Sequence, residues 1–118
     1  MPNINDFDQL YRCTLTEKAG ATSPHRLELG RVGAGKIRVI THVTVENTES
    51  TYDKVRIGID AGGNVFYLDE LLDPVEGELA VSRSDILLGE GDVFFAKCEG
   101  CGEDEPLILT AIGWENEL

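Results

Sequence analysis

The chain has 118 residues, a length typical of one domain, and 42% of them are hydrophobic, which is enough to form a packed core. No apolar run approaches the roughly 18 residues of a membrane span. The segment Met1–Asp6 has neither the basic region nor the apolar core of a secretion signal. We therefore expect a soluble protein with one domain and no second catalytic domain.

Charge is unevenly distributed along the chain. The net charge is −12, from 10 Lys and Arg against 22 Asp and Glu. Residues 1–59 carry 8 basic and 7 acidic side chains, whereas residues 60–118 carry 2 basic and 15 acidic ones. Such a surface repels phosphate backbones and anionic lipids, so we predict no nucleic-acid and no membrane partner. The acidity predicts a solvated surface; the alternatives are docking onto a basic partner and binding a hard cation.

The first part of the chain predicts an arm followed by short strands. Residues 1–9 are polar and predict an N-terminal arm, and residues 10–118 predict a single β-sandwich domain. Strands are expected at Leu10–Thr16 and Arg26–Leu29. Helical periodicity is nearly absent, and a short helical turn is expected at Ile4–Leu10 or around Asp69–Leu72.

The clearest signal is alternation in the middle of the chain. From Ile37 to Val45 apolar β-branched side chains recur at odd positions, and Val55–Ile59 repeats the pattern. Because Asn47–Tyr52 is rich in turn-forming residues, these two runs are predicted to form a hairpin. A second turn at Asp60–Asn64 leads into another strand. The remaining predicted strands are Val65–Leu68, Leu79–Ser82, Asp92–Cys98 and Leu107–Trp114.

Short strands at this spacing, separated by Gly-rich turns, predict an all-β fold: a single-domain antiparallel β-sandwich of the jelly-roll type, with about eight strands. Alternate residues of two facing sheets should form the core. We assign the core to Leu27, Leu29, Val39, Val43, Val45, Val55, Ile57, Ile59, Phe66, Phe94, Leu109 and Trp114.

The segment Gly30–Lys36 fits the first seven places of a phosphate-binding P-loop. Ile37 then stands where a magnesium-binding hydroxyl is required, and a strand pattern follows where the motif needs a helix. We therefore interpret this segment as a Gly-rich turn that leads into a strand.

Three cysteines raise the question of a metal or redox site. Cys98 and Cys101 form one CxxC, whereas a structural zinc site needs four ligands; Cys13, His25 and His42 complete it only if the fold gathers them. A thioredoxin-like pair needs a helix N-terminus, which is not expected here. We predict no metal and no cofactor, with Cys98 and Cys101 as the only candidate ligands, and incidental thiols or a local disulfide as the other interpretations.

The sequence indicates no catalytic constellation. Cupin-type metal sites need several His, and only His25 and His42 are present, on different predicted segments. No Ser-His-Asp arrangement can be built, and the carboxylates are too numerous to single out a general acid and base. The acidic clusters Asp69–Asp73 and Glu103–Glu105 lack the spacing of an EF-hand, so calcium binding is not expected. The prediction is a protein that is not an enzyme.

Two segments together carry a family resemblance: Val43–Gly58, and Leu87–Phe95 followed by Leu107–Trp114. Over about residues 36–114 the layout resembles small β-sandwich virion proteins of tailed bacteriophages, including capsid decoration (cement) proteins and head-tail joining components. The resemblance implies a protein without chemistry that functions through its surfaces. It also implies a homo-oligomer, for example a trimer. Its partners would be the major capsid protein or other virion proteins. It would lie at the capsid surface of a virion that is assembled in the host cytoplasm.

Our leading prediction is a non-enzymatic virion structural protein, a capsid decoration protein that stabilises the phage head through protein–protein contacts. A head-tail connector or tail component is the first alternative. A carbohydrate- or ligand-binding β-sandwich module is the second; it would need several exposed aromatic side chains on one face. The N-terminal arm would become ordered on a neighbouring subunit.

Overall fold

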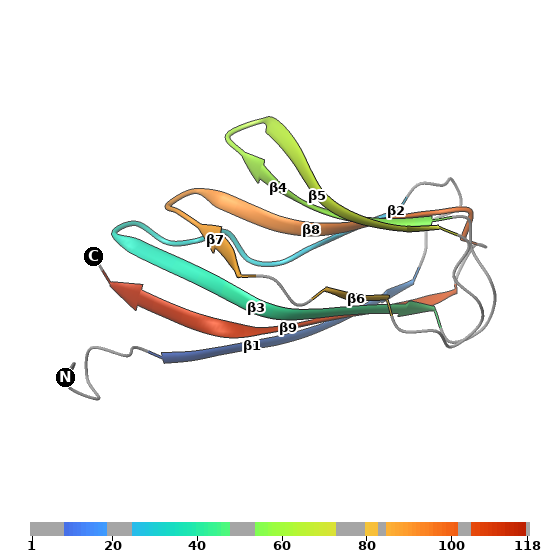
Figure 1. The fold of residues 1–118 in the computed structure, drawn as a ribbon, viewed down its shortest axis with the longest axis horizontal. Helices are drawn as coiled ribbons and strands as arrows, with labels where there is room; N and C mark the ends of the chain where they lie inside the picture. The colour runs from blue at the N-terminus through green and yellow to red at the C-terminus, as the bar shows by residue number, and fades with distance from the viewer. Residues whose placement is uncertain are drawn as a thin grey trace.

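The computed structural model describes residues 9–18, 25–47, 54–72, 80–82, 85–101 and 105–117. These residues form two antiparallel sheets that pack face to face (Figure 1). No described helix is long and apolar enough to cross a membrane. The strands are β1 (Gln9–Lys18), β2 (His25–Glu28), β3 (Lys36–Asn47), β4 (Lys54–Ala61), β5 (Asn64–Leu72), β6 (Ala80–Ser82), β7 (Ile86–Leu88), β8 (Asp92–Glu99) and β9 (Pro106–Glu117).

The strand order identifies the sandwich as a jelly roll. One sheet runs β1-β9-β3-β6, with β7 also paired to β3, and the other runs β2-β8-β4-β5. Because β6 and β7 pair with successive parts of β3, they share one edge position, and each sheet is four strands wide. The chain alternates between the sheets as the double Greek key requires. The predicted all-β sandwich with about eight strands is confirmed.

The predicted hairpin between the runs Ile37–Val45 and Val55–Ile59 is wrong. These runs lie in β3 and β4, which belong to opposite sheets: β3 pairs with β6, β7 and β9, whereas β4 pairs with β5 and β8. The predicted loop Asn47–Tyr52 therefore connects the two layers. Alternation identifies a strand but not its partner, and a loop of several residues suits a crossing as well as a hairpin.

The turn at Asp60–Asn64 does form the predicted hairpin. Ala61 pairs with Asn64 across Gly62 and Gly63, which have φ values of 62° and 95°. This two-residue turn with positive φ is the type that suits the twist of a hairpin. The helical turn expected around Asp69–Leu72 is wrong, since these residues continue β5.

The other expected helical turn, Ile4–Leu10, lies mostly outside the described residues, and its last two residues belong to β1. The predicted arm, residues 1–9, also lies outside them except for Gln9. Most of the remaining predicted strands appear with extended ends, whereas β2 begins and ends one residue earlier than predicted, and of Leu79–Ser82 the structure describes Ala80–Ser82 as β6. Strand β7 was not predicted. At three residues β7 is too short to show a periodic pattern.

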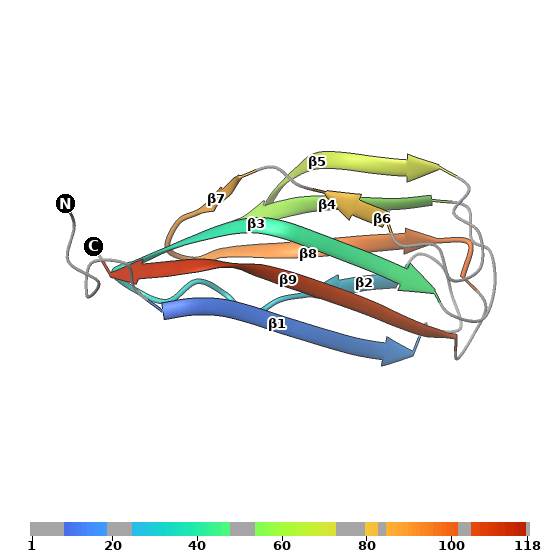
Figure 2. The same ribbon diagram turned by 60° about the horizontal axis from the view of Figure 1, so that its bottom comes forward.

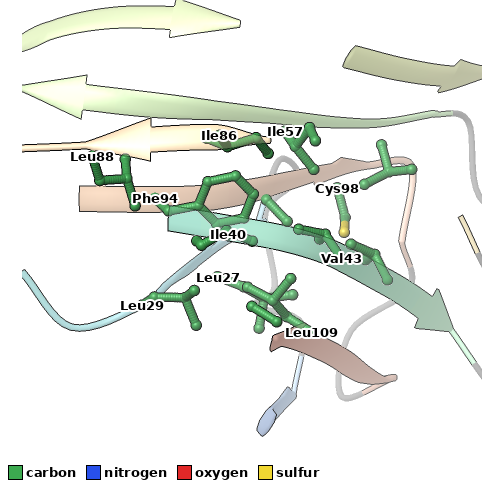
Figure 3. Packing of buried hydrophobic residues seen from close by; sticks show 14 of the residues in the cluster. Leu27, Leu29, Ile40, Val43, Ile57, Ile86, Leu88, Phe94, Cys98 and Leu109 are labelled. Carbon is green, nitrogen blue, oxygen red and sulfur yellow. The ribbon is translucent and has the colours of Figure 1, made fainter. Parts of the chain in front are cut away.

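The core lies between the sheets, where apolar side chains of both inner faces meet (Figure 3). Phe94, with a fully buried ring, fills its centre. The larger strands β3, β8 and β9 supply most of the partners. Of the predicted core residues, the structure buries Leu27, Leu29, Val43, Val45, Val55, Ile57, Phe94 and Leu109, and packs Ile59 partly buried against them.

Val39, Phe66 and Trp114 are the wrong core assignments. In β9 the buried side chains stand at odd positions from Leu107 on, so Trp114 points to the opposite face from Leu109. A β-bulge in β3 between Ile40 and His42 shifts the register, and therefore the inward positions change from even to odd along that strand. Val39 consequently faces outward while Val43 faces the core. Phe66 lies on the exposed edge strand β5.

Gly113 makes the bulge possible. It pairs with Ile40, and a Cβ atom added there would overlap the backbone of Val39 and meet the Cα of Ile40 at 2.8 Å. Only a residue without a side chain allows this approach. One glycine in β9 therefore permits the bulge that turns Val39 to the surface.

Candidate interaction surface

The outer face of the five-stranded sheet carries a continuous row of apolar side chains, which we call the apolar row: Leu10, Trp114, Val39 and Leu87. Trp114 of β9 pairs with Leu10 of β1 on one side and with Val39 of β3 on the other. Val39 in turn pairs with Leu87 of β7. Because paired residues project from the same face, the row crosses β1, β9, β3 and β7. Figure 2 shows β9 lying between β1 and β3 in this sheet.

The apolar row is open to solvent. Leu10 is 50% exposed, Trp114 47% and Leu87 64%. Ile112, which lies two residues before Trp114 on the same face of β9, is also exposed. Beside Trp114 lies a hollow of about 330 Å³, lined by Ile37, Val39, Trp114 and Asn116. Three of its four lining residues are apolar, so the hollow suits an apolar side chain of a partner better than a polar ligand.

The same face has few acidic side chains, although the protein is strongly acidic. By register, the described outward positions of β1, β3 and β9 are mostly apolar or Thr. The charged residues among them are Arg12 and Lys18 of β1 and Glu46 of β3. A contact here would therefore bury few carboxylates, which favours association.

The outer face of the four-stranded sheet is chemically different, because ion pairs cover it. The shortest join Arg26 to Asp60 at 2.9 Å and Arg56 to Glu70 at 2.8 Å. These hydrogen bonds lower the pKa values of the carboxyl groups of Asp60 and Glu70. Further pairs are Arg26–Glu28 at 3.4 Å, Lys54–Glu99 at 3.1 Å and Lys97–Glu99 at 4.0 Å.

An aromatic ring on that charged face is covered by its own molecule. Phe95 of β8 projects outward but is only 1% exposed. The guanidinium of Arg26 lies 3.9 Å above its ring, and Tyr67 contacts it edge-on with the centroids 5.8 Å apart. Gly58 leaves room for the ring, since a Cβ there would lie 2.9 Å from Cζ of Phe95. Arg26 and Tyr67 thus shield the apolar group of this face.

Behind the apolar row, a buried ion pair joins β3 and β9. The guanidinium of Arg38 donates to Glu115 at 2.8 Å and to the carbonyl of Gly30 at 2.7 Å. It also lies 4.1 Å above the ring of Tyr11. Burial raises the pKa of the Tyr11 hydroxyl, against a smaller opposing effect of Arg38. This cluster joins the ends of three neighbouring strands beneath the row.

The cysteines lie at the end of β8 and in β1, and no disulfide joins Cys13, Cys98 and Cys101. Cys98 is buried in the core, and its pKa is raised by the hydrogen bond with Cys101 and by burial. A thiol held protonated is a poor nucleophile. The raised pKa therefore disfavours a reactive thiolate at Cys98.

The histidines lie apart. His25 of β2 contacts Glu17 of β1 at 3.0 Å, bridging the two sheets, whereas His42 lies on the outer side of β3. Within the described ranges, no three His, Cys, Asp or Glu side chains gather closely enough to hold a metal ion. The acidic clusters fall partly outside these ranges; Asp69 and Glu70 lie in β5.

The P-loop-like segment Gly30–Lys36 is a turn that leads into β3, as interpreted from the sequence. Gly35 has a φ of 70°, and the amide of Lys36 donates to the carbonyl of Gly33. Val32 is buried; its amide donates to the carbonyl of Asp92, the first residue of β8, and its carbonyl accepts from the amide of Gly91. Backbone groups that bond to a neighbouring loop are not available to cradle phosphate.

The acidic second half of the chain does not form one side of the molecule. β9, from this half, lies between β1 and β3 in the five-stranded sheet. The uneven charge along the sequence therefore does not become one acidic face, because the jelly roll interleaves both halves of the chain in each sheet.

No protein-family model and no curated protein matches the sequence. Several solved structures share the fold. A subunit of the disulfide-linked pili called Bacillus endospore appendages matches with a TM-score of 0.53 and 14% identity, covering 93% of this chain and 88% of that one. The Drosophila NLP core, studied for pentamer formation and histone binding, matches with a TM-score of 0.50 and 15% identity, covering 93% and 100%.

A putative α-L-fucosidase from Bacteroides thetaiotaomicron matches with a TM-score of 0.51 and 8% identity, over 85% of this chain and 21% of that one. Infectious bursal disease virus structures also match, but with TM-scores from 0.38 to 0.43 they carry no argument. At these identities the similarities establish the jelly-roll fold alone. The fold occurs in subunits of assemblies and in an enzyme, so function must be argued from the surface.

Proposed function

We propose that this protein is a non-enzymatic structural subunit that docks onto a larger protein assembly through the outer face of its five-stranded sheet. The observation that carries the proposal is the apolar row, which crosses the whole sheet and is open to solvent on a protein of net charge −12. Exposed apolar side chains aligned in this way mark protein interaction sites.

The specific assembly that we propose is a tailed-phage capsid, with the protein in the role of a decoration subunit. The resemblance of residues 36–114 to small virion β-sandwich proteins supports this choice. Each bound copy would place Trp114 and Leu87 against the shell, and repetition over a symmetric lattice would multiply a modest contact. Under the alternative of a head-tail connector or tail component, the same face would dock, but in few copies.

Carbohydrate binding is the second candidate function, because Trp114 is exposed beside a hollow and was wrongly expected in the core. A sugar ring can stack on an exposed indole. Only Asn116 adds a polar group to the lining, however, and sugar recognition needs several convergent hydrogen-bonding groups. The chemistry of the hollow therefore favours an apolar protein side chain.

Quantitative peptide mass spectrometry of the particle fraction from the source tests the assembly. A copy number that is a simple fraction of the major shell protein supports decoration, and about a dozen copies or fewer per particle supports a connector or tail part. Absence from the particles contradicts both.

A matched pair of variants tests the docking face. Trp114→Ser should abolish co-sedimentation with particles, whereas Lys97→Ser, on the outer face of the other sheet, should leave it unchanged. Quenching of Trp114 fluorescence by soluble oligosaccharides, together with unchanged particle binding of Trp114→Ser, would favour the carbohydrate-binding function instead.

A further inference from the structure

A second exposed apolar surface lies on the other sheet, at strand β5. Four consecutive residues of β5 are large, hydrophobic and exposed: Val65, Phe66, Tyr67 and Leu68. Phe66 pairs with Ile59, whose side chain packs on the core, so Phe66 is on the inner face. It is nevertheless 56% exposed. The β4–β5 hairpin bends away from the five-stranded sheet at its tip, which leaves this part of the inner face uncovered (Figure 1).

β5 is an edge strand, and among the described strands it pairs only with β4. Its backbone follows a two-residue turn, across which Ala61 and Asn64 pair. In such a hairpin the residues next to the turn bond to each other, and the following residue directs its N–H and C=O to the open side. Val65 therefore presents a backbone donor and acceptor at the edge, next to an apolar run.

The other described edges carry features that prevent strand addition, and the first half of β5 has none of them. β1 presents charged and hydroxyl side chains on its exposed positions after Leu10, including Arg12 and Lys18. β2 has four residues, and β6 and β7 have three each. In contrast, β5 has nine residues and contains neither Lys nor Pro, and its one register shift against β4 lies at Leu68, at the end of the apolar run. A long apolar edge is a template for pairing with another strand.

The charges along β5 favour a second copy of this chain as the partner. Its acidic residues, Asp69 and Glu70, both lie beyond the apolar run, and Glu70 is paired with Arg56 at 2.8 Å. In an antiparallel pair centred on Phe66, each Phe66 faces its equivalent, and Val65 of one copy faces Tyr67 of the other. Asn64 then faces Leu68, the residue at the register shift of β5, and Asp69 and Glu70 lie beyond the paired segment, so no carboxylate opposes another.

We propose that two copies of the protein associate through antiparallel pairing of their β5 strands, about a two-fold axis at Phe66, to form one continuous sheet across both subunits. The contact is isologous, so it closes on itself at the dimer. It leaves the apolar row on the other sheet free, and it is therefore independent of the proposed docking function.

Sedimentation equilibrium of the full chain over a wide concentration range tests the proposal. The wild-type protein should show a reversible monomer–dimer equilibrium. Val65→Pro removes the edge N–H, and Phe66→Lys places two like charges opposite each other at the axis. Each should raise the dissociation constant at least about a hundredfold, by loss of buried apolar area and of main-chain bonds. Thr14→Lys, at an exposed position of β1 outside the apolar row, should leave the dissociation constant unchanged.

A charge-reversal experiment tests the register. Phe66→Lys and Phe66→Asp should each be monomeric alone, and their mixture should form a heterodimer because opposite charges then meet at the axis. This result decides the matter even if Val65→Pro fails to fold. A wild-type protein that stays monomeric at every concentration, a dimer insensitive to the β5 variants, or a mixture without heterodimer would overturn the proposal.

Discussion

Trp114 and Phe95 both project outward from a central strand, on opposite faces of the sandwich, but they differ in how far other side chains of the protein cover them. Both are aromatic side chains that project outward from a central strand. Phe95 is 1% exposed because Arg26 and Tyr67 cover it, whereas Trp114 is 47% exposed in a row of other apolar side chains. The comparison teaches that this chain can cover an outward aromatic ring, so the open row around Trp114 needs another explanation.

The surroundings of the two rings extend the contrast. Around Phe95, Lys, Arg, Asp and Glu side chains form ion pairs that are well solvated, and a partner that docked there would have to displace their water. Around Trp114, the neighbouring outward positions are mostly apolar or Thr. The centre of the charged face is therefore suited to solvent, although its edge strand β5 exposes Val65, Tyr67 and Leu72. The outer face of the five-stranded sheet is suited to contact with another protein.

The largest expected effect concerns the bulge opposite Gly113, which turns Val39 to the outer face beside Trp114. Gly113→Val should give the largest loss of stability, at least about 4 kcal/mol or failure to fold, because its side chain would overlap the backbone of β3. Gly30→Ala is the matched control, since nothing lies within 4 Å of a Cβ there. Urea denaturation measures both, and a Gly113→Val protein as stable as the control would refute this role of the bulge.

Strand β9 allows the two sides of the five-stranded sheet to be compared within one element. Leu109→Ala should cost about 3 to 4 kcal/mol, since Leu109 is fully buried in the core. Trp114→Ala removes a larger side chain yet should cost under about 1 kcal/mol, because the ring is outside the core. Thermal or urea unfolding gives both values. Equal losses would mean that Trp114 is a core residue after all.

The buried ion pair beneath the row should matter more than any exposed charge on the same sheet. Arg38→Met should cost about 2 kcal/mol, because it removes the donor to the carbonyl of Gly30 and leaves Glu115 with Lys36, at 3.5 Å, in place of the Arg38 hydrogen bond. Arg12→Met, at an exposed position of β1, should change stability by less than about 0.5 kcal/mol. If denaturant unfolding ranks the two variants equally, the buried pair does not stabilise the sheet.

The ion pair between Arg26 and Asp60 on the charged face should make thermal stability depend on pH. The hydrogen bond from Arg26 lowers the pKa of Asp60, so the ion pair stabilises the fold above the usual Asp value of about 3.9, and this stabilisation is lost as pH falls through the folded-state pKa. Asp60→Asn should therefore unfold at a slightly lower temperature than wild type at neutral pH and at the same temperature in strong acid. A difference between the two proteins that persists in strong acid would argue against this ion pair.

Strand positions and fold class could be predicted from the sequence because period-two alternation and Gly-rich turns are local signals. The pairing partner of each strand could not be predicted, because no residue in the run Ile37–Val45 indicates that its neighbour is Leu107–Trp114 rather than Val55–Ile59. The bulge also left no local signal, and it alone turns Val39 outward. The outward orientation of Trp114 was predictable, since strict alternation from Leu109 already places Trp114 on the opposite face of the sheet.

The candidate site was the least predictable part. Leu10, Val39, Leu87 and Trp114 come from four strands distributed over the whole chain, and only the register aligns them. The motifs that the sequence singled out, the P-loop-like turn and the CxxC, lie in loops and in the core instead. A surface built across strands has no spacing in the sequence, which is why motif analysis did not find it.

Covalent footprinting of the protein, free and bound to particles from the source, with hydroxyl radicals and with a carbodiimide-coupled carboxyl label, tests the central claim most directly. The readouts are oxidation of Trp114, the only tryptophan in the chain, and carboxyl labelling of Glu28 on the opposite face. The docking account predicts that binding protects Trp114 and leaves Glu28 as reactive as in the free protein. Protection of Glu28 with Trp114 still freely oxidised would contradict it and would assign docking to the charged face.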